Sequence, residues 1–322
     1  MEDTSFRVTT DADKPMESLV ASIESVGLLS PPILRPLVEG RFQVLSGFRR
    51  LRALLSLGRA SAECRIVEDG AEDPLTCLKL GIADNASRRN LNPVEQALAV
   101  DRILAFVRDT DRGCAILSSL GVPVNPLLAG KLKTLLSLPR PILDYAAREA
   151  VAFPVALFLA GLNESDALIL ADIFADLRLG TNKQREVAVL AQEIAAREET
   201  SISGLLEKDG EIRTILEDPE EDRGLKAARL RVCLEKRRFP VLSRSRECYR
   251  ELEKRLKLGR RTRLRPPENF EGSDFVLELT FSDMSEFRRH AAQVDRLAAG
   301  DLLKTILERC GSPADAARKQ KA

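Results

Sequence analysis

The fold of this chain is decided by the stretch Val44-Leu-Ser-Gly-Phe-Arg-Arg-Leu-Arg-Ala-Leu-Leu55. Its pattern predicts a short buried strand, a turn at Gly47 and a helix that begins at once. A turn of this kind directs free backbone N–H groups and the positive end of the helix dipole at one point. Arg49, Arg50 and Arg52 add guanidinium groups beside them, which suits a polyphosphate. An ordinary strand, turn and helix with solvated arginines is equally consistent with this stretch alone.

The composition bounds the class of protein. The chain has 322 residues, of which 44% are hydrophobic and 4% aromatic, with no Trp. This length allows two or three domains that each bury a core, and the residue usage favours helix. The six cysteines lie far apart without a Cys-x-x-Cys pair, so we expect free thiols in a reducing compartment and no zinc site.

Targeting and membrane signals are not apparent. The first five residues, Met1-Glu-Asp-Thr-Ser5, do not resemble a secretion signal. No apolar run approaches the roughly 18 residues that a membrane span requires. We therefore expect a cytoplasmic protein with no membrane partner. The single histidine, His290, has no matching nucleophile or ligand in the sequence around it, which argues against catalysis by histidine.

The net charge of +1 conceals a strong asymmetry. Residues 223–265 contain 17 Lys and Arg against 4 Asp and Glu, a local balance of +13, so the remainder of the chain sums to −12. A basic block of this kind is typical of a nucleic-acid contact, but it also fits solvated helices that complement an acidic partner.

The first part of the chain predicts a compact α+β domain with a small mixed sheet. An apolar stripe predicts a helix that starts at Met16 and ends at Gly27. Strands are expected over 33–38, 41–45 and 62–67 and a helix over 74–80, around the opening stretch. Residues 1–15 are expected to form an arm or a short first strand.

A second polar cluster precedes a helix start. Asn92 is a predicted N-cap for a helix that begins at Pro93. Just upstream, Asp84, Asn85 and Arg88 lie about one helical turn apart. An acid and an amide can hold hydrated Mg²⁺ or a ribose while an arginine contacts phosphate. The alternative is a capped helix junction whose charges only face solvent.

Together these stretches resemble the ParB/sulfiredoxin superfamily, and specifically the ParB-like N-terminal domain of bacterial chromosome and plasmid partition proteins. The resemblance is carried by three segments in the family's order and spacing. They are Gly27-Leu-Leu-Ser-Pro-Pro-Ile-Leu-Arg-Pro36, Ser46-Gly-Phe-Arg-Arg-Leu-Arg-Ala53, and Asp84-Asn-Ala-Ser-Arg88 followed by Leu91-Asn-Pro-Val-Glu-Gln-Ala97.

The resemblance implies a pocket for CTP and Mg²⁺. It implies that Asp84 and Asn85 hold the metal, with Asp84 as the candidate catalytic residue of a weak CTPase. The residues implied to bind the nucleotide are Gly47, Arg49, Arg50, Arg52, Asn85 and Arg88.

Three departures from the family pattern affect the expected chemistry. Phe48 stands where ParB proteins carry Glu and where sulfiredoxins need a cysteine, so the reductase activity is not expected. Asp84 replaces a longer Glu, and Ser30 replaces Gln. A carboxylate withdrawn by one methylene misplaces the water or metal that it orients. The site therefore favours nucleotide binding over hydrolysis.

The middle of the chain, residues 93–206, is helical in pattern and resembles the helix-turn-helix domain of ParB. The two helices of that motif are expected over 115–120 and 127–138. The exposed polar candidates for DNA contact on the second helix are Lys131, Lys133 and Thr134. Since the preceding turn contains no basic or hydroxyl side chain, a purely structural helical bundle remains an open alternative.

The rest of the chain predicts a linker over 207–224 and a small C-terminal αβ module over 225–311. Two basic amphipathic helices, 225–234 and 244–258, precede an alternating strand over 275–281. A helix follows over 284–299, and this strand–helix order resembles the ParB dimerisation module. Residues 312–322 are expected to be disordered. With the ParB/sulfiredoxin-like domain over 1–92, these segments account for the chain.

Three functions compete at this stage. The first is a CTP-gated homodimer that engages DNA in partition or chromosome organisation. The second is a nucleotide-binding adaptor that has lost DNA recognition and binds a protein partner through the basic block 223–265. The third is a metal-dependent nuclease, for which the single acid Asp84 makes a poor two-metal site.

Overall fold

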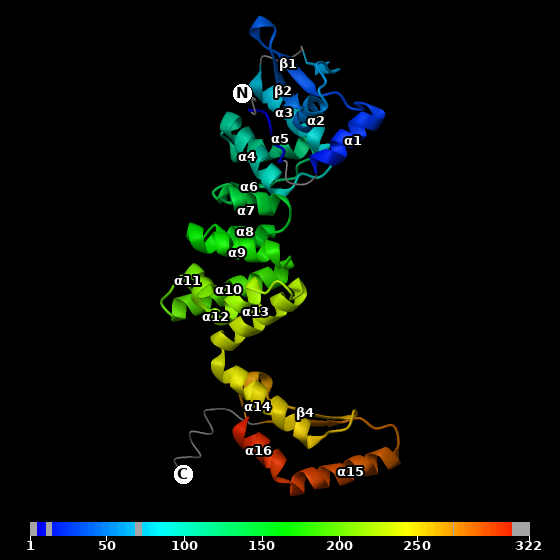
Figure 1. The fold of residues 1–322 in the computed structure, drawn as a ribbon, viewed down its shortest axis with the longest axis vertical. Helices are drawn as coiled ribbons and strands as arrows, with labels where there is room; N and C mark the ends of the chain where they lie inside the picture. The colour runs from blue at the N-terminus through cyan, green and yellow to red at the C-terminus, as the bar shows by residue number, and fades with distance from the viewer. Residues whose placement is uncertain (1–4, 11–14, 68–72, 273, 311–322) are drawn as a thin grey trace. The chain divides into compact units, whose positions relative to one another are not determined.

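The computed structural model describes residues 5–10, 15–67, 73–272 and 274–310 (Figure 1). The chain divides into two compact units. The first comprises residues 1–189, 201–208 and 219–227, and the second comprises residues 190–200, 209–218 and 228–322.

The first unit begins with a small mixed sheet, as the sequence predicted. Its strand order is β2-β1-β3, in which β1 pairs antiparallel with β2 and parallel with β3. The elements of this part are α1 Met16–Val26, β1 Ile33–Pro36, a 3₁₀ turn Val38–Gly40, β2 Phe42–Ser46, α2 Phe48–Ser56, β3 Arg65–Ile66 and α3 Pro74–Ala86.

Helix α3 packs closely on strand β2, and this contact positions the site described below. Gly81 makes the approach possible, because a Cβ at this position would lie 2.7 Å from the backbone oxygen of Leu45. Leu78 and Ile82 on either side of it are buried, as is Leu45 itself. The close approach brings the C-terminal end of α3 to the end of β2 and the start of α2.

Helix α1 covers α2 through a small apolar cluster. Ile23 packs with Ala53 and Leu54, and Leu19 and Val20 join them at its edge. The apolar stripe seen in the sequence is therefore the contact face, and the predicted stop at Gly27 is confirmed by its φ of +78°. Figure 1 shows α1 beside α2.

A run of helices follows, as the sequence predicted. Several begin with an Asn or Asp cap, and Asn92 and Glu95 form the full reciprocal capping box at the start of α4. The helices are α4 Pro93–Val107, α5 Thr110–Ser119, α6 Pro126–Leu135, α7 Arg140–Ala147, α8 Phe153–Leu159, α9 Glu164–Asp176, α10 Thr181–Arg197 and α11 Ile202–Lys208.

The C-terminal part of the chain contains a two-stranded antiparallel sheet with helices. Tyr249 and Leu252 of α14 pack with Leu264, Phe270 and Ile306 in a separate apolar core. The elements are α12 Gly210–Glu217, α13 Arg223–Arg238, α14 Pro240–Leu256, β4 Thr262–Arg265, a 3₁₀ turn Glu268–Phe270, β5 Val276–Leu279, α15 Met284–Ala299 and α16 Asp301–Arg309.

The structure differs from the sequence prediction in two segments. The stretch predicted as a linker contains helix α12, which Asp209 caps and whose Ile212 and Ile215 are buried, so residues 210–217 are not irregular. The basic run 260–265, for which no strand was predicted, forms β4 and pairs with β5. The predicted disordered tail lies outside the described residues.

The packing at Gly81 generates a stability prediction. Gly81→Ala is expected to lower the free energy of unfolding by about 1–3 kcal/mol, because the added methyl group meets backbone rather than a movable side chain. Gly130→Ala in α6 is the matched control, since nothing lies within 4 Å of its Cβ position. That variant should gain up to about 1 kcal/mol from helix propensity. Urea unfolding of both variants checks this, and equal effects would contradict the close packing.

Candidate functional site

The turn at Gly47 joins β2 directly to α2. Gly47 is the N-cap of α2, with φ +97° and ψ 20°, a conformation that side chains disfavour. A Cβ there would lie 2.9 Å from the Cα of Pro32. Both the positive φ and the close approach to Pro32 therefore require glycine at position 47. The free N–H groups of the first turn of α2 begin at this point.

Asp84 at the end of α3 is the centre of the polar contacts below this turn. The Ser46 hydroxyl donates to its Oδ2 at 2.6 Å, and Nη2 of Arg50 lies 3.3 Å from the same oxygen. Arg88 donates to Oδ1 from Nη2 at 2.8 Å and from Nε at 3.2 Å. One carboxylate thus joins the end of α3 and the residue just beyond it to the turn between β2 and α2, two segments that are distant in the sequence.

The single negative charge of Asp84 lies between two positively charged guanidinium groups, those of Arg50 and Arg88. Burial alone would raise the pKa of Asp84, but the hydrogen bonds from Ser46 and Arg88 and the charges of Arg88 and Arg50 lower it below its usual value. Burial lowers the pKa of Arg50, and the positive charge of Arg88 lowers it further. Two guanidinium groups therefore share a single carboxylate, and the cluster keeps an excess of positive charge.

Oxygen atoms of Ser30 and Pro31 hold the two arginines in place. Arg50 donates from Nη1 to the backbone oxygens of Ser30 at 2.6 Å and Pro31 at 3.2 Å. Arg88 donates from Nη1 to the Ser30 hydroxyl at 2.9 Å. The segment before β1 therefore orients both guanidinium groups.

Asn85 lies next to this cluster. Its amide nitrogen donates to the backbone oxygen of Gly81 at 2.7 Å. Both carboxylate oxygens of Asp84 already accept hydrogen bonds, so a cation at Asp84 would have to displace Arg88 or Arg50. Among the described residues, no group of three or more His, Cys, Asp or Glu is placed to hold a metal ion.

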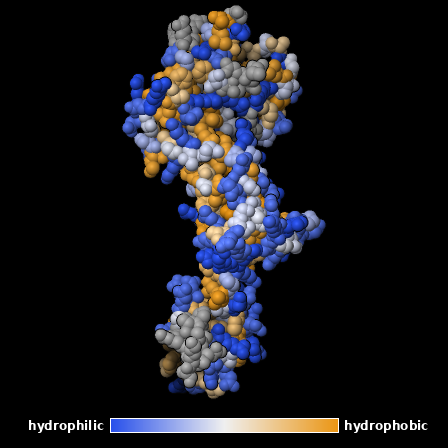
Figure 2. Space-filling view, turned by 90° about the vertical axis from the view of Figure 1, so that its left-hand side faces the viewer, coloured by the Kyte–Doolittle hydropathy of each residue, from blue (hydrophilic) through white to orange (hydrophobic). Residues whose placement is uncertain are grey.

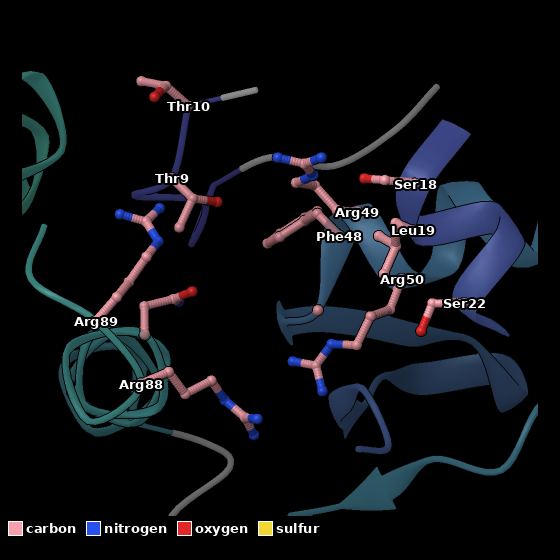
Figure 3. A pocket seen from close by; sticks show the side chains of 12 residues that line it. Thr9, Thr10, Ser18, Leu19, Ser22, Phe48, Arg49, Arg50, Arg88 and Arg89 are labelled. Carbon is pink, nitrogen blue, oxygen red and sulfur yellow. The ribbon is translucent and has the colours of Figure 1, made fainter. Parts of the chain in front are cut away.

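A pocket of about 470 Å³ opens above these contacts (Figure 3). Arg49 and Arg50 lie on one side of it, and Arg88 and Arg89 lie on the opposite side. None of the described residues that line the pocket is Asp or Glu. The lining residues are Thr9, Thr10, Ser18, Leu19, Ser22, Gly47, Phe48, Arg49, Arg50, Asn85, Arg88 and Arg89.

The residues predicted to bind a nucleotide are mostly brought together here. The predicted residues that line the pocket are Gly47, Arg49, Arg50, Asn85 and Arg88. Arg52 lies about one turn further along α2 and is not among the lining residues, whereas Asp84 lies behind the pocket wall and contacts Arg50 and Arg88.

Phe48 fills the wall of the pocket instead of reaching into it. Its side chain is only 4% exposed, and the guanidinium carbon of Arg7 lies 5.9 Å from its ring centroid. A cation over an aromatic face is a favourable arrangement. The position where ParB proteins carry Glu is thus an apolar anchor in this chain.

Sequence reasoning missed Arg89 and the threonines of the N-terminal segment. Arg89 pairs with both carboxylate oxygens of Glu95, at 2.6 and 2.7 Å, and Glu95 is completely buried. The backbone N–H of Thr10 donates to the same carboxylate at 2.9 Å. The predicted helix start at Pro93 places Glu95 in the first turn of that helix, but the contact of Glu95 with Thr10 spans 85 positions and leaves no local signal.

The predicted DNA-contact residues lie on α6, which follows α5 across a short turn. Lys131, Lys133 and Thr134 are all exposed on this helix, and the Thr134 hydroxyl donates to the backbone oxygen of Gly130 at 3.2 Å. The helices predicted for the motif are confirmed as elements, while the role of these three side chains stays a prediction.

Much of the basic block 223–265 is engaged in ion pairs. Arg237 contacts Glu198 and Asp209, which tie α13 to the segments before it. Further pairs join Arg238 to Glu193, Arg246 to Glu235, Lys236 to Glu247, Arg261 to Glu286 and Arg265 to Glu278. The local excess of +13 is therefore partly neutralised inside the fold.

Comparison with known proteins agrees with the fold of the N-terminal part. Residues 3–78 match the family of the ParB N-terminal domain. The N-terminal part of this chain is accordingly a ParB-like N-terminal domain, and the small mixed sheet followed by helices confirms the predicted fold class.

Individual relatives match part of the chain. A probable chromosome-partitioning protein ParB from Pseudomonas putida is 27% identical over 150 residues, which cover 47% of this chain and 49% of that protein. The chain thus aligns with about half the length of this relative. The Caulobacter crescentus ParB truncated at its C-terminus and bound to the centromeric parS site is 24% identical with a TM-score of 0.33, over 54% of this chain and 88% of that one. The same protein with CTP-gamma-S covers 52% and 92% at 24% identity and a TM-score of 0.21.

The surface carries both hydrophilic and hydrophobic areas on the face seen in Figure 2, where the hydrophilic areas are extensive. Within the described ranges, no helix is long and apolar enough to cross a membrane.

The lowered pKa of Asp84 generates a pH prediction. A carboxylate whose pKa is lowered by folding stabilises the fold above its unfolded-state pKa of about 3.9, and this contribution is lost as the pH falls through the lower folded-state pKa. Asp84→Asn should therefore destabilise the protein at pH 7, and the difference should shrink below about pH 4. Urea unfolding across this range measures it. Asp295→Asn on the exposed face of α15 is the control, and a pH-independent difference for Asp84→Asn would contradict the account.

Proposed function

We propose that this chain binds CTP in the pocket above Asp84 and that the nucleotide controls its association with DNA as a homodimer. The observation that carries the proposal is the opposition of four arginines across the pocket, next to the N-terminus of α2 (Figure 3). Since no carboxylate is among the described lining residues, this cavity favours an anion.

The phosphate groups are the best-supported part of the ligand. Arginine guanidinium groups bind phosphate oxygens through paired hydrogen bonds, and free N–H groups at a helix start add further donors. Arg49 and Arg50 extend from the first turn of α2, so both kinds of donor share one end of the pocket. A volume of about 470 Å³ lies within the range of small-molecule sites.

The choice of CTP rests on the ParB-like N-terminal domain. Cytosine preference is a property implied by the resemblance of residues 27–36, 46–53 and 84–97 to the ParB boxes. Because Arg52 does not line the pocket, its positive charge is proposed to attract the triphosphate without a direct contact.

Mg²⁺ is proposed to accompany the triphosphate. Asp84 and Asn85 are the protein groups that would face it, and a carboxylate with an amide suits this ion. Because Arg88 donates a hydrogen bond to the Asp84 carboxylate in the structure, a metal ion can bind this carboxylate only if Arg88 moves away. A bound metal would neutralise phosphate charge, and Asp84 would then be the candidate residue for slow CTP hydrolysis.

Arg88 is the proposed switch. Its side chain is 49% exposed, whereas its partner Asp84 is only 13% exposed, so the arginine can move while the carboxylate stays fixed. In the structure Arg88 joins Asp84 to Ser30. A triphosphate offers it a competing anion, and the difference in contacts between the two states would set their populations.

DNA binding is proposed for the helical part over 93–206. Lys131, Lys133 and Thr134 are exposed on α6, in the position of the second helix of a helix-turn-helix. The Pseudomonas putida relative is a probable chromosome-partitioning protein, which supports a DNA-associated role in partition or chromosome organisation.

Dimerisation is proposed for the C-terminal module over 225–311. An apolar groove of about 190 Å³ lies in this module, and Val276 and Phe281 are exposed near it on β5 and just after it. Surfaces of this kind favour association with a second apolar surface. The groove is lined by Leu256, Leu258, Leu264, Phe275, Leu277, Leu297, Leu303 and Leu307.

The second candidate is the adaptor that binds nucleotide and a protein partner but not DNA. Ion pairs with Glu198, Asp209 and Glu193 leave fewer cations of the block 223–265 for phosphate contacts than the sequence suggested, and they also reduce the charge that this block offers to an acidic partner. A nuclease is the third candidate and would have to work with Asp84 as the single acid of the site.

Calorimetric titration with each of the four nucleoside triphosphates tests the nucleotide proposal. CTP is expected to bind the wild type most tightly, and Arg88→Gln is expected to weaken it by at least about tenfold, as removal of a charged hydrogen-bonding partner does. Arg59→Ala is the control, since Arg59 is exposed just beyond α2. No binding of any triphosphate by the wild type would refute the proposal.

Salt-dependent anisotropy with duplex DNA separates the two main candidates. If phosphate contacts dominate, the affinity for DNA should fall steeply between about 50 and 200 mM salt, because binding releases the counterions of the contacted phosphates. The double change Lys131→Ala and Lys133→Ala should reduce the salt slope by roughly 2. Lys183→Ala is the control, because Lys183 is exposed on α10. Absence of DNA binding at low salt would favour the adaptor.

A further inference from the structure

A second cavity of about 230 Å³ lies on the other side of the N-terminal segment. Thr9 and Thr10 line both cavities, so this short segment separates them. The second cavity is built from α4 and α7 together with Arg7, and none of the arginines of the nucleotide pocket contributes to it.

Arg102 of α4 is the unusual group in this cavity. Its Nη1 atom is buried and has no hydrogen-bond partner among the described residues. A buried guanidinium nitrogen without a partner is costly, because the water that it loses on folding is not replaced. Burial lowers the pKa of Arg102, the negative charge of Asp101 raises it, and the positive charge of Arg7 lowers it by less than Asp101 raises it. The fold thus keeps a partly buried guanidinium group with one unsatisfied nitrogen here.

The charged side chains that line the cavity together with Arg102 are mostly positive. Arg7 donates from Nε to the backbone oxygen of Thr9 at 3.1 Å and also lies over the Phe48 ring. Asp144 is the one carboxylate among the described residues that line the cavity, and it pairs with Arg140 at 2.9 Å. Among the described residues that line the cavity, three are arginines and one is a carboxylate, and that carboxylate already pairs with Arg140.

We propose that this cavity binds a small phosphate-type anion, with Arg102 as its central contact. A tetrahedral oxyanion accepts hydrogen bonds from the guanidinium groups that line the cavity, and its charge offsets the repulsion between Arg102 and Arg7. Phosphate is favoured over a halide because a guanidinium group donates two parallel hydrogen bonds to oxygen atoms. Inorganic phosphate and the phosphate group of a small ester share this chemistry.

The site does not depend on the nucleotide proposal. The anion would bridge Arg7 of the N-terminal segment, Arg102 of α4 and Arg140 of α7, whereas the nucleotide pocket uses α2 and the end of α3. Variants can therefore disable either cavity separately. Arg140 is 81% exposed, so its removal leaves the core intact and serves as a second probe of the site.

Calorimetric titration of the full chain with sodium phosphate at constant ionic strength tests this proposal. Binding is expected in the wild type and also in a variant that carries both Arg50→Ala and Arg88→Gln, which removes two arginines from the nucleotide pocket. Arg102→Leu should weaken binding at least about tenfold and Arg140→Ala by a few fold. Parallel titrations with glycerol 3-phosphate separate the free anion from a phosphate ester, and tighter binding of either one supports the site.

Thermal unfolding keeps the test independent of folding defects. Without phosphate, Arg102→Leu should unfold at the same temperature as the wild type or higher, because it removes a nitrogen that is buried without a hydrogen-bond partner. With phosphate, the wild type should gain stability and Arg102→Leu should not. The proposal is overturned if the wild type binds no phosphate, or if Arg50→Ala with Arg88→Gln abolishes binding while Arg102→Leu preserves it.

Discussion

The carboxylate of Asp84 is the interaction on which the candidate site depends. It accepts hydrogen bonds from Ser46 at the end of β2 and from Arg88 beyond α3, and it pairs with Arg50 in the first turn of α2. Each partner comes from one of the segments that resemble the ParB boxes. A single partly buried acid thus positions two arginines for an anion, and the excess positive charge remains available to a ligand.

Two glycines, Gly47 and Gly81, make this arrangement possible in different ways. Gly47 adopts a positive φ and lies so close to Pro32 that a side chain would clash, which fixes the turn into α2. Gly81 lets α3 approach the backbone of β2 and carries Asp84 to Ser46. The geometry of the site is therefore a consequence of backbone packing as well as of the charged side chains themselves.

Part of this could be predicted from the sequence, and the remainder depended on contacts that local patterns do not contain. The turn at Gly47, the arginines of α2 and the N-cap at Asn92 are local features with clear signals. Helix α3 was predicted over 74–80 but continues to Ala86, and Gly81 inside it lets the helix pack against the backbone of β2. The hydrogen bond between Thr10 and Glu95 could not be predicted, because it joins positions far apart in the sequence. The stretch 210–217 is helical because Ile212 and Ile215 are buried.

The central claim is that a nucleoside triphosphate lies between Arg49 and Arg50 on one side and Arg88 on the other. The most direct measurement is a crystal structure of this chain with CTP and Mg²⁺. The account predicts phosphate oxygens within hydrogen-bond distance of Arg49 and Arg50, with Arg88 withdrawn from Asp84 towards the triphosphate. An Arg88 that still pairs with Asp84 beside an empty pocket, at CTP concentrations that saturate a binding assay, would contradict it.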